Sequence, residues 1–118
     1  MEVRRGDIVL ANFDPTEGSE QRGTRPAMVV QNDTGNRYAN TTILAPLTTS
    51  YDPANVAPYE AEVRAANTVV DQDSVALLNQ LRTMSIPDRI YDNFGILDPD
   101  GPEMAAIDEA IEISLGLR

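Results

Sequence analysis

Residues 14–32 read DPTEGSEQRGTRPAMVVQN, and this stretch does most to decide the fold. Its first five residues are turn formers. The apolar run Ala-Met-Val-Val that follows Pro26 predicts a buried strand over 26–31. Before that run, Gly18 and Gly23 bracket a polar segment, and glycine lets such a segment fold back tightly. The stretch therefore predicts a polar loop that leads into a core strand.

Short apolar runs separated by turn residues continue on either side of this stretch. We expect further strands over 8–13, 41–47, 59–63 and 68–70, with turns at 14–18 and 32–36. Residues 74–84 are apolar except for Asn79 and Gln80 in the middle, so a bent strand and a short helical turn both remain open there. The first two-thirds of the chain is thus predicted to be rich in β-strands.

The C-terminal third carries helical signals. A short helix is predicted over 87–93. A longer helix follows, with Pro102 in its first turn, a capping box formed by Asp100 and Glu103, and Gly116 at its end. One face of this helix carries apolar residues at helical spacing, which indicates packing against a core: Met104, Ile107, Ile111 and Leu115.

The length of 118 residues corresponds to about one domain. Close-set strands followed by a helix predict that residues 1–118 form a β-rich α+β domain, an SH3-like small β-barrel with a C-terminal α-helix. A domain of this size buries only part of its surface, which favours a homodimer. The chain has no run of 18 or more apolar residues and no charged-then-apolar leader, so we expect a cytoplasmic protein that does not enter a membrane.

The amino acids that the chain lacks restrict its chemistry. There is no Cys and no His, which excludes a thiolate nucleophile, cysteine-ligated zinc and the most common acid–base group near pH 7. All nine basic residues are arginines, so a lysine Schiff base is excluded as well. Asp71 and Asp73 form an Asp-x-Asp pair that could hold Mg²⁺, but a solvated turn is the simpler interpretation, and we expect neither a metal nor a cofactor.

The net charge of −10, taken alone, argues against a polyanionic ligand. The charge is unevenly distributed, however. Residues 1–50 hold five arginines and six acids, whereas residues 51–118 hold four arginines and thirteen acids. A locally positive surface can therefore exist around the N-terminal arginines.

Arg25 stands between the bracketed loop and the strand that follows it. Because Arg25 precedes Pro26, its backbone is biased towards an extended conformation, which fixes its side chain relative to the loop. From spacing alone, a polar hairpin loop with Arg25 in a surface ion pair is the simpler interpretation. The loop itself offers hydroxyl, carboxylate, amide and guanidinium groups on Ser19, Glu20, Gln21 and Arg22.

Residues 14–32 resemble the signature of the MazF (PemK-like) toxins of bacterial toxin–antitoxin pairs. The resemblance extends over nearly the whole chain in ordered blocks, which lie at Arg5–Ile8, Gln31–Arg37, Thr41–Thr48, Asp73–Thr83 and the terminal helix. Ordered blocks at the expected spacing are far more specific than a single short motif.

The resemblance implies a homodimer of SH3-like barrels that cuts single-stranded mRNA at short sequences without metal, leaving a 2′,3′-cyclic phosphate and a 5′-hydroxyl. It places the family's catalytic arginine on Arg25 and its catalytic threonine on Thr48. It also implies a cognate antitoxin whose acidic, partly disordered tail covers the RNA groove. Contacts with RNA are then expected from Ser19, Gln21, Arg22, Thr49, Asn79, Gln80 and Arg82.

The chemistry of this cleavage suits the residues present. The ribose 2′-hydroxyl attacks its own phosphorus, and a planar guanidinium can donate two parallel hydrogen bonds to the phosphoryl oxygens on which charge develops. Arginine has a pKa above about 12, so Arg25 is expected to stabilise the transition state rather than to act as the base. Glu20 is the nearest carboxylate candidate for the base, although an ion pair with Arg22 or Arg25 is an equally good interpretation.

Two other interpretations remain open. The first is a non-enzymatic toxin on the same fold, resembling the CcdB type that binds and poisons DNA gyrase. The second is an SH3-like binding module without activity. Neither would need the pair of Arg25 and Thr48 or the loop before them.

Overall fold

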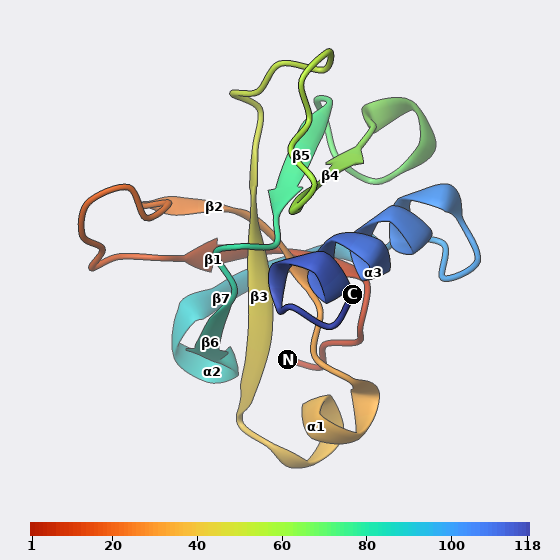
Figure 1. Ribbon diagram of the computed structural model, residues 1–118. Coiled ribbons are helices and arrows are strands. Elements are labelled where there is room, and N and C mark those ends of the chain that lie inside the picture. Colours follow the sequence, from red (N-terminus) through yellow and green to blue (C-terminus); the bar gives the residue numbers. More distant parts are fainter.

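The computed structural model describes residues 1–118 except for the side chain of Asn67. In this part of the chain the strands are β1 (Asp7–Asn12), β2 (Thr24–Val29), β3 (Thr41–Thr48), β4 (Glu60–Val63), β5 (Ser74–Leu77), β6 (Arg82–Ser85) and β7 (Ile90–Ile96). The helices are α1 (Asp33–Tyr38), α2 (Ile86–Arg89) and α3 (Pro102–Ser114), with a 3-10 turn over Ala65–Asn67. Figure 1 shows their arrangement.

An antiparallel sheet of seven strands is organised around β3, in the order β4-β5-β3-β2-β1-β7 with β6 paired to β3 off this path. The first half of β3 pairs with β6, and its last residue, Thr48, pairs with Val75 of β5. The strands β1 and β2 cross β3 in Figure 1. Within the described residues β4 and β7 do not pair with each other, so the sheet stays open. The β-rich α+β class is confirmed, whereas the expected barrel does not close.

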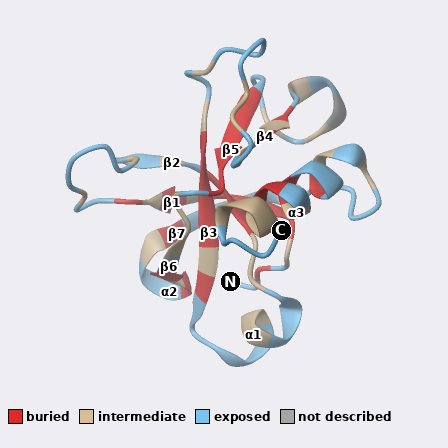
Figure 2. Ribbon diagram, viewed as in Figure 1, coloured by how far each residue is buried: buried red, intermediate tan, exposed pale blue. Residues whose placement is uncertain are grey.

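Two buried clusters form the core, and neighbouring strand residues alternate between them. Figure 2 shows buried residues on β3, β5 and α3. Ile8 belongs to the first cluster and Val9 to the second. Helix α3 covers the first cluster with its buried residues Met104, Ile107 and Ala110. The second cluster is closed by residues of α2, β6 and β7, namely Ile86, Met84 and Ile90. The sheet therefore has apolar packing on both faces.

Two predictions about turns and strands are wrong for local reasons. The turn expected at 32–36 is helix α1, because the side chain of Asn32 accepts a hydrogen bond from the Gly35 N–H at 2.7 Å and so caps a helix. Residues 68–70 do not form a strand, and the Thr68 hydroxyl instead donates to the Arg64 carbonyl at 2.8 Å.

Residues 74–84 resolve into two strands, β5 and β6, joined by a turn. The Gln80 N–H closes that turn by donating to the Leu77 carbonyl at 3.1 Å. The helix expected over 87–93 is a single turn, α2, because the chain then continues as β7 and pairs with β1. Pairing with the sheet thus overrides the local helical signal.

The C-terminal helix is confirmed with different ends. Its N-cap is Gly101 and no side chain caps it, so the predicted capping box is wrong. Gly116 has a positive φ of 73° directly after the helix, as expected for a C-terminal glycine. Leu115, predicted to face the core, is 58% exposed. Among the described residues, the helices are all too short or too polar to cross a bilayer.

Candidate functional site

The loop between β1 and β2, residues 13–23, closes on itself at its base. The Phe13 N–H donates to the Gly23 carbonyl at 2.9 Å, and the Gly23 N–H donates to Asp14 Oδ1 at 3.0 Å. Gly18 and Gly23 have positive φ values of 57° and 77°, a backbone conformation that residues with a side chain rarely adopt. In Figure 1 this loop projects to the left of the sheet. The two glycines that bracket the polar segment in the sequence therefore both adopt backbone conformations that favour glycine.

Arg25 lies on β2 directly after this loop, and its guanidinium is held from two sides. Its Nε donates to the Arg22 carbonyl at 2.8 Å, and its Nη1 donates to the Leu47 carbonyl at 3.3 Å. A guanidinium has five N–H groups. Within the described residues these two bonds leave three N–H groups for an anion, and the side chain is only half-buried.

Thr48 follows Leu47 at the end of β3, so the contact of Arg25 with the Leu47 carbonyl brings the two candidate catalytic residues together. The Oγ1 atom of Thr48 accepts a hydrogen bond from the Ser50 N–H at 3.1 Å. Accepting this bond leaves the hydroxyl hydrogen of Thr48 available to donate. The next residue, Thr49, is exposed. The charged donor Arg25 thus contacts the residue that directly precedes the neutral donor Thr48.

A pocket of about 200 Å³ lies next to the loop, lined by Phe13, Glu20, Gln21, Asn79, Gln80, Leu81 and Arg82. The Gln21 N–H donates to Gln80 Oε1 at 2.8 Å, which ties the loop to the turn between β5 and β6. Five of the site residues predicted from the sequence therefore line one pocket, although they come from two distant parts of the chain. They are Glu20, Gln21, Asn79, Gln80 and Arg82. The other predicted site residues do not line this pocket: Arg25 and Thr48 are half-buried, and Ser19, Arg22 and Thr49 are exposed.

Glu20 is exposed, and one of its carboxylate oxygens accepts a hydrogen bond from the Glu17 N–H at 2.6 Å. Within the described residues it makes no ion pair with Arg22 or Arg25, so the alternative interpretation of Glu20 is wrong. Its other oxygen accepts no hydrogen bond within the described residues.

The arginines around the loop bond to backbone carbonyls rather than to acids. Arg22 donates to the Gly18 carbonyl at 2.7 Å, and Arg89 donates to the carbonyls of Asn12 and Asp14. The ion pairs of the described residues involve other arginines, which are Arg4, Arg5, Arg64 and Arg118. A backbone carbonyl has no net charge. The positive charge of these arginines is therefore not balanced by a neighbouring carboxylate within the described residues, although the whole chain has a net charge of −10. Sequence reasoning missed Arg89, which has no motif of its own.

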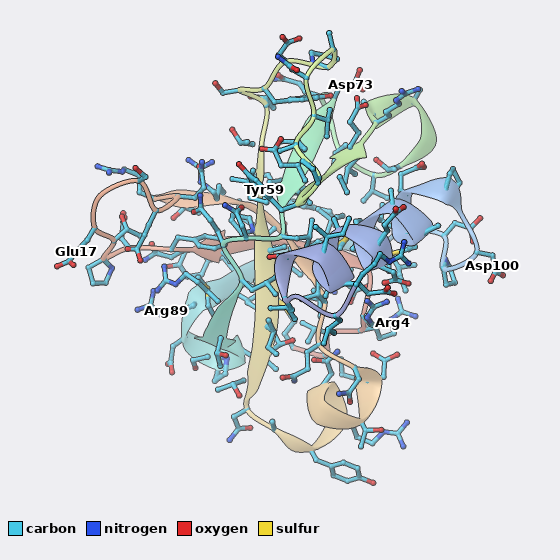
Figure 3. All side chains as sticks on the ribbon, in the orientation of Figure 1. Arg4, Glu17, Tyr59, Asp73, Arg89 and Asp100 are labelled. Carbon is cyan, nitrogen blue, oxygen red and sulfur yellow. The ribbon has the colours of Figure 1, made fainter. Side chains whose placement is uncertain are left out.

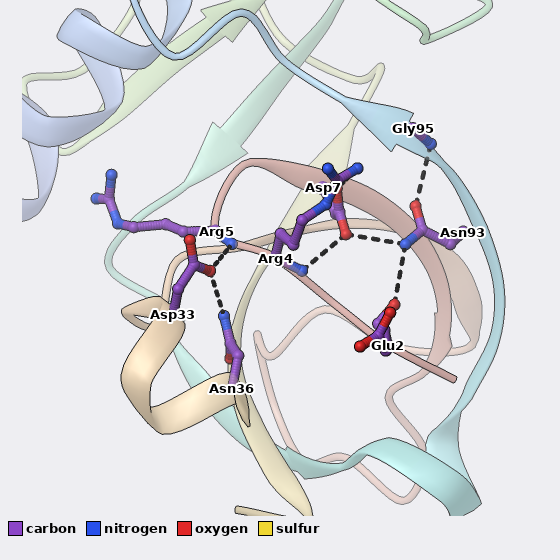
Figure 4. A network of polar contacts seen from close by, with 8 residues as sticks. All are labelled: Glu2, Arg4, Arg5, Asp7, Asp33, Asn36, Asn93 and Gly95. Atoms are coloured by element: carbon purple, nitrogen blue, oxygen red, sulfur yellow. Dashed lines mark hydrogen bonds and ion pairs between the residues drawn. The ribbon is translucent and has the colours of Figure 1, made fainter. Parts of the chain in front are cut away.

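A larger cavity of about 510 Å³ lies elsewhere, lined by the N-terminal segment, α1 and α2. None of the predicted site residues lines it. Figure 4 shows a polar network nearby, in which buried Asp7 accepts hydrogen bonds from the Arg4 N–H at 2.8 Å and from Asn93 Nδ2 at 2.9 Å. Asp33 accepts from the Arg5 N–H at 2.7 Å, and this bond lowers the pKa of Asp33. These contacts anchor the N-terminal segment against α1 and β7.

The metal interpretation of Asp71 and Asp73 gains no support. Both side chains are exposed, and Asp73 Oδ1 accepts a hydrogen bond from the Ala65 N–H at 2.8 Å. In the part of the chain that the structure describes, no three Asp or Glu side chains are grouped closely enough to hold a metal ion.

Comparison with known proteins identifies a family of similar proteins. Residues 4–115 match the family model described as PemK-like, MazF-like toxin of type II toxin-antitoxin system. Endoribonuclease MazF of Staphylococcus epidermidis is 41% identical over 116 residues, which cover 98% of this chain and 93% of that protein.

Solved structures share the fold at lower identity. MazF from Deinococcus radiodurans has a TM-score of 0.80 at 23% identity, with 98% of each chain covered. An endoribonuclease in complex with its cognate antitoxin from Mycobacterial species has a TM-score of 0.78 at 19% identity, with 98% of this chain and 97% of that chain covered.

Proposed function

The chain belongs to the PemK-like, MazF-like toxin family of type II toxin–antitoxin systems, and we propose that it is an endoribonuclease that cuts single-stranded mRNA at short sequences without a metal ion. The related protein that is 41% identical is named an endoribonuclease, which favours this activity over gyrase poisoning of the CcdB type. The observation that carries the proposal is the placement of the Arg25 guanidinium against the Leu47 carbonyl, one residue from Thr48.

In the proposed reaction, the 2′-oxygen of a ribose forms a bond to the adjacent phosphorus, and the bond from phosphorus to the 5′-oxygen breaks. The products are a 2′,3′-cyclic phosphate and a 5′-hydroxyl. Glu20 accepts the proton of the 2′-hydroxyl. A water molecule donates a proton to the leaving 5′-oxygen. Because the attacking oxygen is tethered to the same nucleotide, alignment by binding supplies much of the rate acceleration.

Arg25 and Thr48 stabilise the charge that develops on the phosphoryl oxygens. The two carbonyl contacts of Arg25 orient its guanidinium before RNA binds, so little reorganisation is needed during the reaction. Thr48 adds a hydrogen bond without bringing a charge. Removing one preorganised donor of this kind typically costs a factor of about 10²–10³ in kcat.

RNA binding is assigned to the pocket and to the exposed rim of the loop. The amide side chains of Asn79 and Gln80 and the backbone near Gln21 can read base edges in the pocket. Arg22 on the rim provides charge for the phosphates. Ser19 and Thr49 contribute hydroxyl groups on exposed positions beside the loop and β3. We expect strong salt dependence and weak sequence-independent binding, because most of the surface is acidic.

The proposed partners are a second copy of the chain and a cognate antitoxin. One solved structure of similar fold is an endoribonuclease with its cognate antitoxin, and another is the MazE–MazF complex of Deinococcus radiodurans. An antitoxin with an acidic tail would complement the arginines around the loop, which make no ion pairs within the described residues. An mRNA substrate favours a location in the cytoplasm, which is part of the proposal.

The test is cleavage of a mixed RNA pool in EDTA by the unaltered protein and by Arg25→Ala and Thr48→Ala. We expect each substitution to lower the cleavage rate by a factor of about 10²–10³, while circular dichroism and the unfolding midpoint stay close to those of the unaltered protein. Full cleavage by both variants would overturn the assignment of these residues.

A further inference from the structure

We propose that Arg82 and Arg89 are positioning residues, which hold the loop between β1 and β2 and thereby orient the guanidinium of Arg25. This inference rests on the proposed function of Arg25. It gives Arg89 a role that the sequence did not suggest, and it changes the role of Arg82 from a contact with RNA to a support of the loop.

The two arginines bond to three consecutive carbonyl groups at the end of β1. Arg89 Nη1 donates to the Asn12 carbonyl at 3.1 Å and to the Asp14 carbonyl at 2.7 Å. Arg82 Nη1 donates to the Phe13 carbonyl, and its guanidinium carbon lies 5.6 Å from the centroid of the Phe13 ring. Because a chain has only two soft dihedrals per residue, bonds to three successive carbonyls fix the direction in which it leaves β1.

Both arginines come from a part of the chain far from the loop. Arg82 begins β6 and Arg89 ends α2, and both side chains are half-buried. Figure 3 shows Arg89 on the same side of the molecule as Glu17 of the loop. Hydrogen bonds from a charged donor are about twice as strong as neutral ones. The guanidinium groups therefore connect the loop firmly to the second core cluster, to which Phe13 also belongs.

A short series of contacts leads from these carbonyls to Arg25. Asp14 Oδ1 accepts from the Gly23 N–H at 3.0 Å, and the Phe13 N–H donates to the Gly23 carbonyl at 2.9 Å. The Gly23 N–H and the Arg22 carbonyl belong to one planar peptide unit, so fixing the N–H also fixes the carbonyl. That carbonyl accepts from Arg25 Nε at 2.8 Å. Movement at the end of β1 would therefore rotate the Arg22 carbonyl, which orients the guanidinium of Arg25.

A positioning role and an RNA-contacting role predict different kinetics. An arginine that contacts a phosphate supports binding, so its loss raises KM and reduces the salt slope by about 1. An arginine that positions Arg25 supports the transition state, so its loss lowers kcat with little change in KM. A misplacement of about 1 Å can cost about 10²-fold in rate.

The experiment compares Arg82→Gln and Arg89→Gln with a matched control, Arg37→Gln, which removes the same charge from an exposed position on α1. We expect the kcat of RNA cleavage, measured at saturating RNA, to fall about tenfold or more for Arg82→Gln and Arg89→Gln. We expect KM and its salt dependence to match those of the control. Trypsin should also cut faster after Arg22, the exposed arginine of the loop, in both variants and without RNA.

Asp14→Ala provides a second route to the same outcome, because it removes the contact with the Gly23 N–H while leaving both arginines in place. It should reproduce the loss of kcat and the faster trypsin cleavage. A raised KM with an unchanged kcat, or trypsin rates equal to those of the control, would overturn the positioning role. Failure of the unaltered protein to cut RNA would instead overturn the proposed function, while the trypsin rates would still test the loop contacts.

Discussion

Replacing Thr48 with valine removes one hydroxyl and keeps the shape of the side chain. Thr48 Oγ1 accepts from the Ser50 N–H at 3.1 Å, so its hydroxyl hydrogen is available to a phosphoryl oxygen. Losing such a donor costs about 3–4 kcal/mol of transition-state stabilisation, so kcat should fall by a factor of about 10²–10³. The cost to folding should be only about 0.5–1.5 kcal/mol, because one hydrogen bond at a partly exposed position is lost.

The assay is single-turnover cleavage of an RNA oligonucleotide that contains the preferred site, in EDTA and at saturating protein. Thr48→Ser restores the hydroxyl and should recover most of the rate. Thr34→Val, on the exposed surface of α1, makes the same chemical change away from the site and should leave the rate unaltered. A rate for Thr48→Val within threefold of the unaltered protein, with a similar unfolding midpoint, would refute the role of this hydroxyl.

Further predictions concern the arginine, the core and the acid dependence of stability. Arg25→Lys keeps the charge but loses the planar donor geometry, so kcat should fall by about 10²-fold or more, and a rate near that of the unaltered protein would contradict the geometric argument. Ile107→Ala empties a fully buried site and should lower the free energy of unfolding in urea by about 2–5 kcal/mol, whereas Leu115→Ala, at 58% exposed, should change it by less than about 0.5 kcal/mol. The pKa of Asp33 is lowered chiefly by the hydrogen bond from the Arg5 N–H, so its stabilising contribution is present above about pH 4 and is lost as the pH falls through the lowered pKa. Asp33→Asn should therefore flatten the dependence of stability on pH below about pH 4, and an unchanged profile in denaturation experiments would count against this contact.

Much of the fold could be predicted from local patterns. The runs over 26–31 and 41–47 are apolar enough to mark core strands, and the stripe of Met104 and Ile107 marked the helix that covers the sheet. The errors arose where a local signal competed with another contact. Residues 90–93 pair with β1 instead of extending a helix, and such pairing depends on segments distant in the sequence.

The candidate site was only partly predictable, for a related reason. Spacing drew attention to Arg25 and its glycine-bracketed loop, and the family resemblance paired Arg25 with Thr48. The contact between them through the Leu47 carbonyl depends on how β2 and β3 pair, which the sequence alone does not show. Arg89 was missed because its partners are backbone carbonyls, which leave no trace in the identity of the residues at Asn12 and Asp14.

In the proposed function, this chain cuts RNA by the attack of a 2′-hydroxyl, without a metal ion. The most direct measurement is to incubate the purified protein with a mixed RNA pool in EDTA and to determine the chemistry and sequence of the cut ends. We expect cuts at a limited set of short sequences, with 2′,3′-cyclic phosphate and 5′-hydroxyl ends. Ends with a 5′-phosphate, cleavage only after Mg²⁺ is added, or RNA that stays intact while DNA gyrase is inhibited would contradict it.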